Sequence, residues 1–328
     1  MSNSRVAVGI FALGLMVLGT GVASGQATST SSVQAYPNKP LRVVMAGVGA
    51  GAEIAARLIA AGISGPLGQN LIVDSRGSAT LAAEVVSKAP PDGYSLLLVG
   101  NNLWMTPLTQ KTNYDPVLDY SPISMVTTTP NILIVHPAVP FKSVKELIDL
   151  AKAKPGVLNY AIGAHGGATH LAGELFKSMA GVNIVGVPYK SGGPAINAVI
   201  SGEVQLMFPG GIGVGPQIKS GKLRALAVGS PQPSALFPDL PTVASAGLLG
   251  YESVSTNSVF APAKTPAAII RRLNQEIVRF VSAPDTKARF LDLGVEAVGN
   301  SPEQLAAIIK SEMVRIGKLY KDIGMGIE

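Results

Sequence analysis

The sequence predicts an α/β protein built from two successive blocks of alternating strands and helices. Three observations support this: a globular composition of 47% hydrophobic and 14% charged residues, short apolar runs of strand length, and helical periodicity between those runs. In the first block, strands are expected at 41–46, 70–75 and 94–100, and helices at 54–63 and 84–89. Strands that alternate with helices form a parallel sheet through right-handed crossovers.

The second block follows a β-rich stretch at 121–137. It is expected to open with a helix at 144–154, because Ser143 and Glu146 form a capping box. Later strands are expected at 158–162, 182–189, 204–208 and 223–228, with helices at 170–181 and 194–202.

The chain is expected to end in helices. Thr265-Pro266 and Ser301-Pro302 each supply an N-cap followed by proline at the first helical position. The β-rich segments 130–136 and 253–261 are expected to pair and join the two blocks. A ligand site between the blocks, at the carboxyl ends of strands, then follows.

The N-terminus has the pattern of an export signal. Arg5 precedes a continuous apolar run over 6–23, and small polar residues follow. We therefore predict a cleaved signal peptide over 1–27 and a periplasmic protein; a retained membrane anchor is the alternative.

Composition narrows the classes of function. The chain has no cysteine, which excludes disulfides, zinc–thiolate sites and thiol nucleophiles. Its net charge of +6 comes from dispersed basic residues, which argues against a nucleic-acid partner. No lipase-type, P-loop or metalloprotease motif is present. With only three histidines, the chain has few side chains suited to acid–base catalysis. Binding without catalysis, and without a cofactor, is favoured.

The first glycine-rich loop supports two hypotheses. Gly47, Gly49 and Ala52 match a dinucleotide-binding fingerprint, with Asp74 ending the next strand, so an exported NAD-dependent oxidoreductase is the alternative function. The same glycines would let a helix N-terminus hold any anion, a carboxylate included.

The second glycine-rich loop, from Gly163 to Thr169, raises the same question. His165, His170 and Glu174 could bind a metal, but three ligands with His165 at an uncertain angle make a weak site. An anion cradle at a helix N-terminus is favoured, with His165 as a lining residue.

Two further loops offer ligand contacts. Asn101 and Asn102 follow the third strand and supply amide donors, while Trp104 is either a flat apolar wall or a core residue. Tyr189 and Lys190 end a strand before a glycine-rich turn, where Lys190 either pairs with a carboxylate or is solvated.

The chain resembles one family from about residue 36 to residue 324. The matching segments include YPNKPLRVV, KAPPDGYSLL, YDPVLDYSPIS, SVKELIDLAKAKPGVLNYA, HLAGELFKSMAGVNIVGVPYK and GPAINAVISGEVQLMF. They are similar to the Bug-type periplasmic receptors of tripartite tricarboxylate transporters.

The resemblance implies a type II periplasmic-binding-protein fold with two α/β lobes joined by hinge strands. Lobe 1 would comprise 36–131 and 254–328, and lobe 2 would comprise 132–253. It also implies a monomeric receptor, not an enzyme, that captures a small carboxylate solute and delivers it to the transporter's membrane subunits, or else serves a sensor kinase.

Carried over position by position, the resemblance places the first anion cradle at residues 49–53 and the second at 163–169. Several family hydroxyls are missing, since Gly167 and Ala168 stand where the family has serine and threonine. A roomier, more apolar pocket, as for an aromatic carboxylate, is therefore expected. The predicted ligand-binding residues are Gly49, Ala50, Gly51, Ala52, Glu53, Asn101, Asn102, Trp104, Gly163, His165, Gly166, Gly167, Thr169, Tyr189, Lys190, Phe208 and Gly210.

Overall fold

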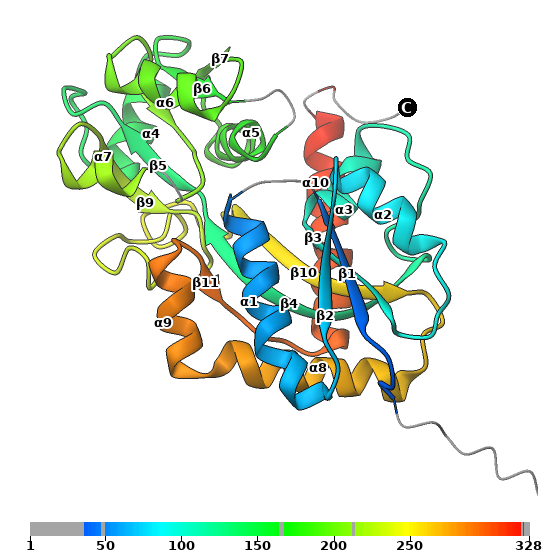
Figure 1. The fold of residues 1–328 in the computed structure, drawn as a ribbon. Helices are drawn as coiled ribbons and strands as arrows, with labels where there is room; N and C mark the ends of the chain where they lie inside the picture. Colours follow the sequence, from blue (N-terminus) through cyan, green and yellow to red (C-terminus); the bar gives the residue numbers. More distant parts are fainter. Residues whose placement is uncertain (1–35, 47–49, 164–166, 212–213, 323, 325–328) are drawn as a thin grey trace, which may run out of the picture. The chain divides into compact units, whose positions relative to one another are not determined.

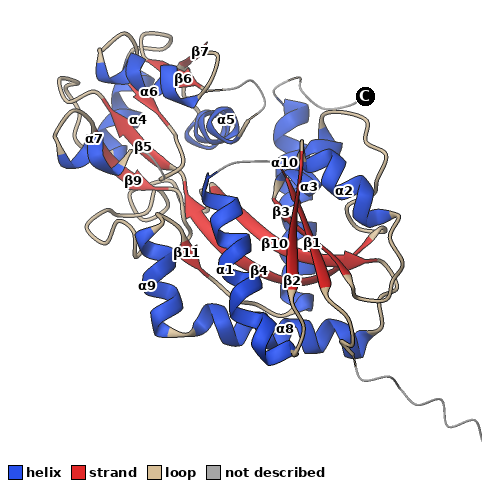
Figure 2. Cartoon of the chain, in the orientation of Figure 1, coloured by secondary structure: helices blue, strands red, loops and turns tan. Residues whose placement is uncertain are grey.

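The protein contains two mixed sheets, each with helices packed on it (Figures 1 and 2). The computed structural model describes residues 36–46, 50–163, 167–211, 214–322 and 324. Among these residues, no helix combines the length and the apolar character needed to cross a membrane.

The first sheet has six strands in the order β11-β4-β10-β3-β1-β2. The strands are β1 (Leu41–Ala46), β2 (Leu71–Arg76), β3 (Ser95–Gly100), β4 (Tyr120–Pro130), β10 (Val254–Pro262) and β11 (Glu296–Ala297). The helices of this lobe are α1 (Ala50–Leu67), α2 (Ala79–Ser87), α3 (Asn102–Met105), the 3₁₀ helix η1 (Thr106–Leu108), α8 (Ala267–Ser282), α9 (Pro284–Asp292) and α10 (Pro302–Asp322). The expected parallel pairing is confirmed for β1, β2 and β3, whereas β10 joins β3 antiparallel.

The second sheet has five strands in the order β7-β6-β8-β5-β9. Its strands are β5 (Ile132–Val135), β6 (Asn159–Ile162), β7 (Val185–Pro188), β8 (Leu206–Met207) and β9 (Arg224–Val228). Its helices are α4 (Val144–Ala153), α5 (Ala168–Ala180), α6 (Gly192–Ile200) and α7 (Gly215–Lys219). The exact limits of the two lobes along the chain stay a prediction.

Two of the three predicted helix starts are confirmed. The Ser143 Oγ accepts the Glu146 N–H at 3.2 Å, and the Ser301 Oγ accepts the Gln304 N–H at 3.2 Å. The Thr265 cap is wrong: α8 has Pro266 as its N-cap, and the Thr265 hydroxyl instead donates to the Pro262 carbonyl. A buried hydroxyl needs a partner, and the preceding turn offers one first.

The chain crosses between the sheets at two adjacent segments. β4 leads directly into β5 through Asn131, and β10 is entered through Ser253. The Asn131 N–H donates to the Ser253 carbonyl at 3.0 Å, so the segments expected to pair, 130–136 and 253–261, do so only at their first residues. Beyond them the expectation is wrong, because β5 pairs with β8 and β9 in the second sheet, and β10 pairs with β3 and β4 in the first. Gly229 lies against both crossing segments, and a Cβ there would be 2.6 Å from the Ser253 carbonyl oxygen. This close approach explains why glycine occupies that position.

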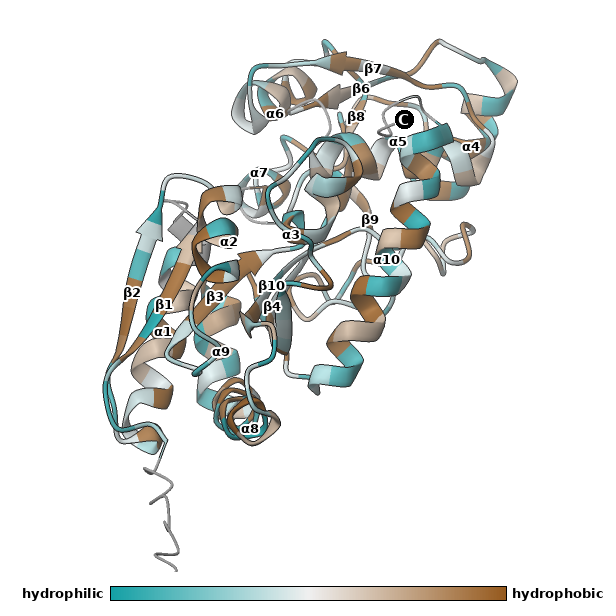
Figure 3. Ribbon diagram, turned by 90° about the vertical axis from the view of Figure 1, so that its right-hand side faces the viewer, coloured by the Kyte–Doolittle hydropathy of each residue, from teal (hydrophilic) through white to brown (hydrophobic). Residues whose placement is uncertain are grey.

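Helix α10 packs into the hydrophobic core of each lobe. Leu305 and Ile309, near its start, are buried with the first sheet, whereas Ile316 and Leu319 are buried with residues of the second. Figure 3 shows apolar and polar residues alternating along this helix, as expected for one that packs a single face. The end of α10 therefore reaches the region where the lobes meet, which the sequence did not indicate.

Candidate functional site: a cavity between the two lobes

A cavity of about 380 Å³ lies where α3 and η1 of the first lobe face the N-terminus of α5 in the second. Three predicted site residues, Asn101, Asn102 and Gly167, line it together. The structure thus brings part of the predicted site to one place.

The second lobe contributes backbone donors to this cavity. Gly167 is the N-cap of α5, with extended backbone, and no N-cap side chain accepts a hydrogen bond from the first turn of the helix. Ala168 follows at the first helical position and also lines the cavity. A helix N-terminus carries a partial positive charge, which favours an anion here.

One local bond fixes a cavity residue of the first lobe, and another lies beside the cavity in the second lobe. The Asn101 side chain donates from Nδ2 to the Val254 carbonyl at 3.1 Å, which ties the end of β3 to the start of β10. In the second lobe, the Gly163 N–H donates to the Thr169 hydroxyl at 3.1 Å. Gly163 and Thr169 are therefore bonded to each other, and neither is among the residues that line the cavity.

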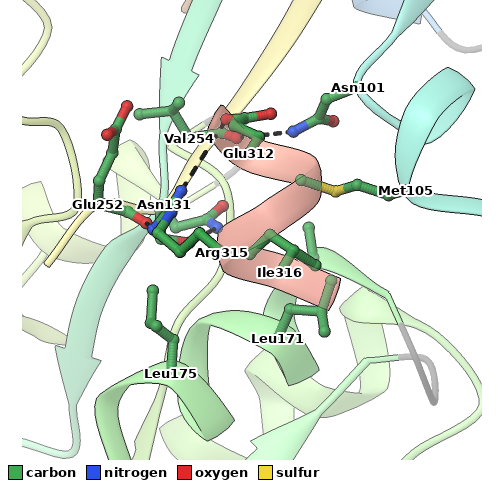
Figure 4. A pocket seen from close by; sticks show the side chains of 12 residues that line it. Asn101, Met105, Asn131, Leu171, Leu175, Glu252, Val254, Glu312, Arg315 and Ile316 are labelled. Carbon is green, nitrogen blue, oxygen red and sulfur yellow. Dashed lines mark hydrogen bonds and ion pairs between the residues drawn. The ribbon is translucent and has the colours of Figure 1, made fainter. Parts of the chain in front are cut away.

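A smaller cavity of about 30 Å³ adjoins the first (Figure 4). The two share Asn101, Met105, Ala168 and Leu171. The smaller one is further lined by Asn131 of the first crossing and by Arg315 of α10. The Asn131 Oδ1 is buried and has no hydrogen-bond partner among the described residues, which is uncommon in a native fold.

The first anion cradle is only partly described. Gly49, His165 and Gly166 lie outside the described residues. Ala50, Gly51 and Ala52 form the start of α1, and Glu53 follows in its first turn. The Glu53 carboxylate pairs with Arg57 at 2.7 Å, one helical turn away, so it is engaged within its own helix.

Two predicted pocket residues lie in hydrophobic cores instead. The Trp104 side chain is 0% exposed, and its Nε1 donates to the Glu312 carboxylate at 2.7 Å. Phe208 is 1% exposed and packs against Tyr160 and Phe176. The placement of both on the pocket wall is wrong, because their apolar area is buried beneath the lobe surfaces.

The remaining predicted residues lie outside both cavities. The Tyr189 hydroxyl donates to Glu203 at 2.8 Å, and Lys190 is exposed. Gly210 bridges to Asn131 through the backbone, and a Cβ on it would lie 3.9 Å from the Asn131 Oδ1. Gly210 is therefore next to the crossing segment, close to the smaller cavity.

The metal hypothesis includes His165, which lies outside the described residues; its other two members are His170 and Glu174. His170 Nε2 is 3.9 Å from the Glu174 Oε1, but that carboxylate already accepts hydrogen bonds from the Tyr160 hydroxyl and the Lys177 ammonium at 2.6 and 2.7 Å. Among the described residues, no three His, Asp or Glu side chains gather closely enough to hold a metal ion.

The NAD hypothesis depends on Asp74, which is already paired. The Asp74 Oδ2 accepts from Arg42 Nε at 2.6 Å and from Arg76 Nη2 at 2.7 Å. Burial raises the pKa of Asp74, but the hydrogen bonds and charges of the two arginines outweigh it and lower that pKa below its usual value. A carboxylate held in this way is not free to bind a ribose.

Replacing Asp74 with asparagine should lower the free energy of unfolding by about 1 kcal/mol near neutral pH, since partial exposure lets solvent screen the pairs. A lowered folded-state pKa gives stability that is present above the unfolded pKa and lost as pH falls through the folded value. The difference should therefore vanish in strong acid. Urea unfolding as a function of pH measures it. Asp149→Asn, which breaks an exposed pair with Lys145, is the control, and a pH-independent loss in Asp74→Asn would contradict the assignment.

Several cavity residues were not predicted. Thr106, Thr109 and Gln110 line the larger cavity from η1 and the turn after it, and Tyr320 lines it from the end of α10. Burial raises the pKa of Tyr320 to about 12, so its hydroxyl stays neutral and able to donate. The threonines had no local motif, and Tyr320 is too distant in sequence for any pattern to link it to Asn101.

The protein has two lobes joined by adjacent crossing segments, with a cavity between the lobes. This arrangement is that of the two-lobed binding proteins. The comparisons agree: a structure of an R. palustris protein with adipate has a TM-score of 0.72 and 32% identity, covering 89% of this chain and 99% of that one. MatC from Rhodopseudomonas palustris with bound malate has a TM-score of 0.66 and 27% identity, covering 87% and 99%.

The family follows from a direct match. The model of the tripartite tricarboxylate transporter family receptor matches residues 55–325, and BugT of Bordetella pertussis is 30% identical over 316 residues, 94% of this chain and 97% of that relative. The chain belongs to this family of periplasmic solute-binding proteins. Because the family is one of binding proteins, membership decides against the oxidoreductase alternative.

Proposed function

We propose that this protein is an exported receptor that captures a small organic carboxylate in the cavity between its lobes and delivers it to tripartite transporter membrane subunits. The observation that carries the proposal is the cavity itself, where Asn101 and Asn102 lie opposite the N-terminus of α5, whose N-cap is a glycine. Amide donors and helical N–H groups are the partners that a carboxylate accepts from. The apolar run after Arg5 supports export through a signal peptide over 1–27.

The lining indicates a solute with an apolar body. Met105 and Leu171 supply an apolar part of the wall, and Thr106, Thr109 and Gln110 supply a polar part. Adipate and malate, which two relatives hold, are therefore suitable first probes, with benzoate for the aromatic class.

A thermal-shift screen tests the proposal. We expect at least one of adipate, malate, citrate and benzoate to raise the midpoint, corresponding to about 2.7 kcal/mol at a hundredfold excess over the dissociation constant. NAD, the control, should have no effect. A protein that responds to none of the acids, or to NAD alone, would refute the proposal.

A further inference from the structure

Arg315 stands out among the charged side chains at the junction of the lobes. It lies on α10 and lines the smaller cavity, where its side chain extends toward the crossing segments that carry Asn131 and Glu252 (Figure 4). The side chain is 30% exposed. Arg315 therefore faces the space between the lobes as well as solvent.

Glu252 and Glu312 line the same small cavity, but among the described residues Arg315 forms no hydrogen bond with either carboxylate. Its Nη1 donates to the Glu252 carbonyl at 2.7 Å, and its Nη2 is 4.0 Å from the Glu312 Oε1, beyond hydrogen-bond distance. The other oxygen of Glu312 accepts from Trp104 Nε1 at 2.7 Å. A guanidinium has five N–H donors, and this one uses a single one in hydrogen bonds among the described residues.

A second observation points to a polar occupant in the same place. The Asn131 side chain, 3% exposed, lines the smaller cavity and has an unpartnered Oδ1. An amide oxygen accepts but cannot donate, so it does not bind a carboxylate directly. A water bridging Asn131 and a carboxylate held by Arg315 satisfies both groups.

The two cavities together suit an elongated ligand. They share Asn101, Ala168, Met105 and Leu171, so a ligand that spans both would meet the N-terminus of α5, then the apolar side chains of Met105 and Leu171, then Arg315. An acid group at each end and an apolar stretch between them match this order of donors, apolar wall and cation.

We propose that Arg315 is a specificity-determining residue that recognises the second carboxylate of a dicarboxylate solute. This inference rests on the proposed function and names a residue that would select among its substrates. It assigns the first carboxylate to the N-terminus of α5 and the second to the guanidinium at the hinge.

Paired probes of equal length test it by calorimetric titration. Succinate with butyrate, adipate with hexanoate, and suberate with octanoate each differ by one carboxylate. We expect the wild-type protein to prefer the dicarboxylate of the best-bound pair by roughly tenfold or more, and Arg315→Met to remove most of that preference. Arg315→Lys keeps the charge and should retain part of it.

The ratio within a pair separates recognition from structure. If Arg315 only held the crossing segment through Glu252, its loss would weaken both members of a pair equally. Lys318→Met removes the same charge from an exposed position on the same helix and should leave the ratio unchanged.

Each outcome decides the matter. An unchanged ratio in Arg315→Met, or a wild-type protein that binds monocarboxylates as tightly as dicarboxylates, would overturn this inference and leave the receptor function intact. A protein that binds none of these acids and none in the thermal screen would overturn the proposed function, and this inference with it.

Discussion

Replacing Ala168 with aspartate is expected to abolish carboxylate binding without harming the fold. Ala168 is exposed, lines both cavities and occupies the first position of α5. A carboxylate there would repel the bound acid at close range by about 4 kcal/mol if the two charges were 4 Å apart in an effective dielectric of about 20. An affinity loss of roughly a hundredfold or more follows.

The same substitution should not destabilise the empty protein. An acidic residue in the first turn of a helix interacts favourably with the helix dipole, by about 0.3–1 kcal/mol. The thermal midpoint without ligand should therefore stay constant or rise slightly. Loss of binding with intact stability distinguishes a ligand contact from a folding defect.

Two controls make the result specific. Ala168→Asn adds nearly the same volume without charge and should cost much less affinity. Ala267→Asp places the same charge at the first position of α8, on an exposed site that lines neither cavity, and should leave binding unchanged. Titration calorimetry on the three variants measures the difference. Wild-type affinity in Ala168→Asp would remove the N-terminus of α5 from the binding site.

The architecture was predictable because its signals are local. One apolar run correctly predicts the strand at Leu41–Ala46, and the caps Ser143 and Ser301 correctly predict the starts of two helices. The N-cap prediction for Thr265 is wrong because a capping side chain can also bond to other nearby backbone groups, and the sequence does not show which partner is closer. A local capping rule is confirmed where no other backbone group competes for the capping side chain.

The site was less predictable because it is assembled from distant segments. Asn101 follows β3 and supplies an amide, and Gly167 belongs to the glycine-rich loop between a strand and a helix, so local patterns predict both. Trp104 also follows β3, yet α10 covers it, and the partner responsible, Glu312, is 208 residues away in the sequence. The sequence also gave no indication of Arg315, whose role depends on where the end of α10 lies.

Replacing Trp104 with alanine is expected to lower the free energy of unfolding by about 4 kcal/mol. The side chain is fully buried, packs edge-on against Phe260, and is the hydrogen-bond donor to a buried glutamate. The substitution therefore creates a large cavity and removes a partner from the Glu312 carboxylate. Each of these effects is costly by itself.

The two effects can be separated by Trp104→Phe, which keeps much of the ring volume and removes only the donor. Burial raises the pKa of Glu312, and the Trp104 hydrogen bond and the Arg315 charge oppose that rise. Without the donor the folded-state pKa rises further. A raised carboxyl pKa disfavours the folded state only where the group must ionise, so the cost should develop as pH increases through that range and disappear below it.

Denaturant unfolding at several pH values measures both variants. The deficit of Trp104→Phe should shrink in acid, whereas that of Trp104→Ala should keep its pH-independent cavity component. Adding Glu312→Gln to Trp104→Phe removes the buried charge and should recover part of the loss near neutral pH, a coupling that a double-mutant cycle detects. Full additivity of the two substitutions would mean that Trp104 contributes packing alone.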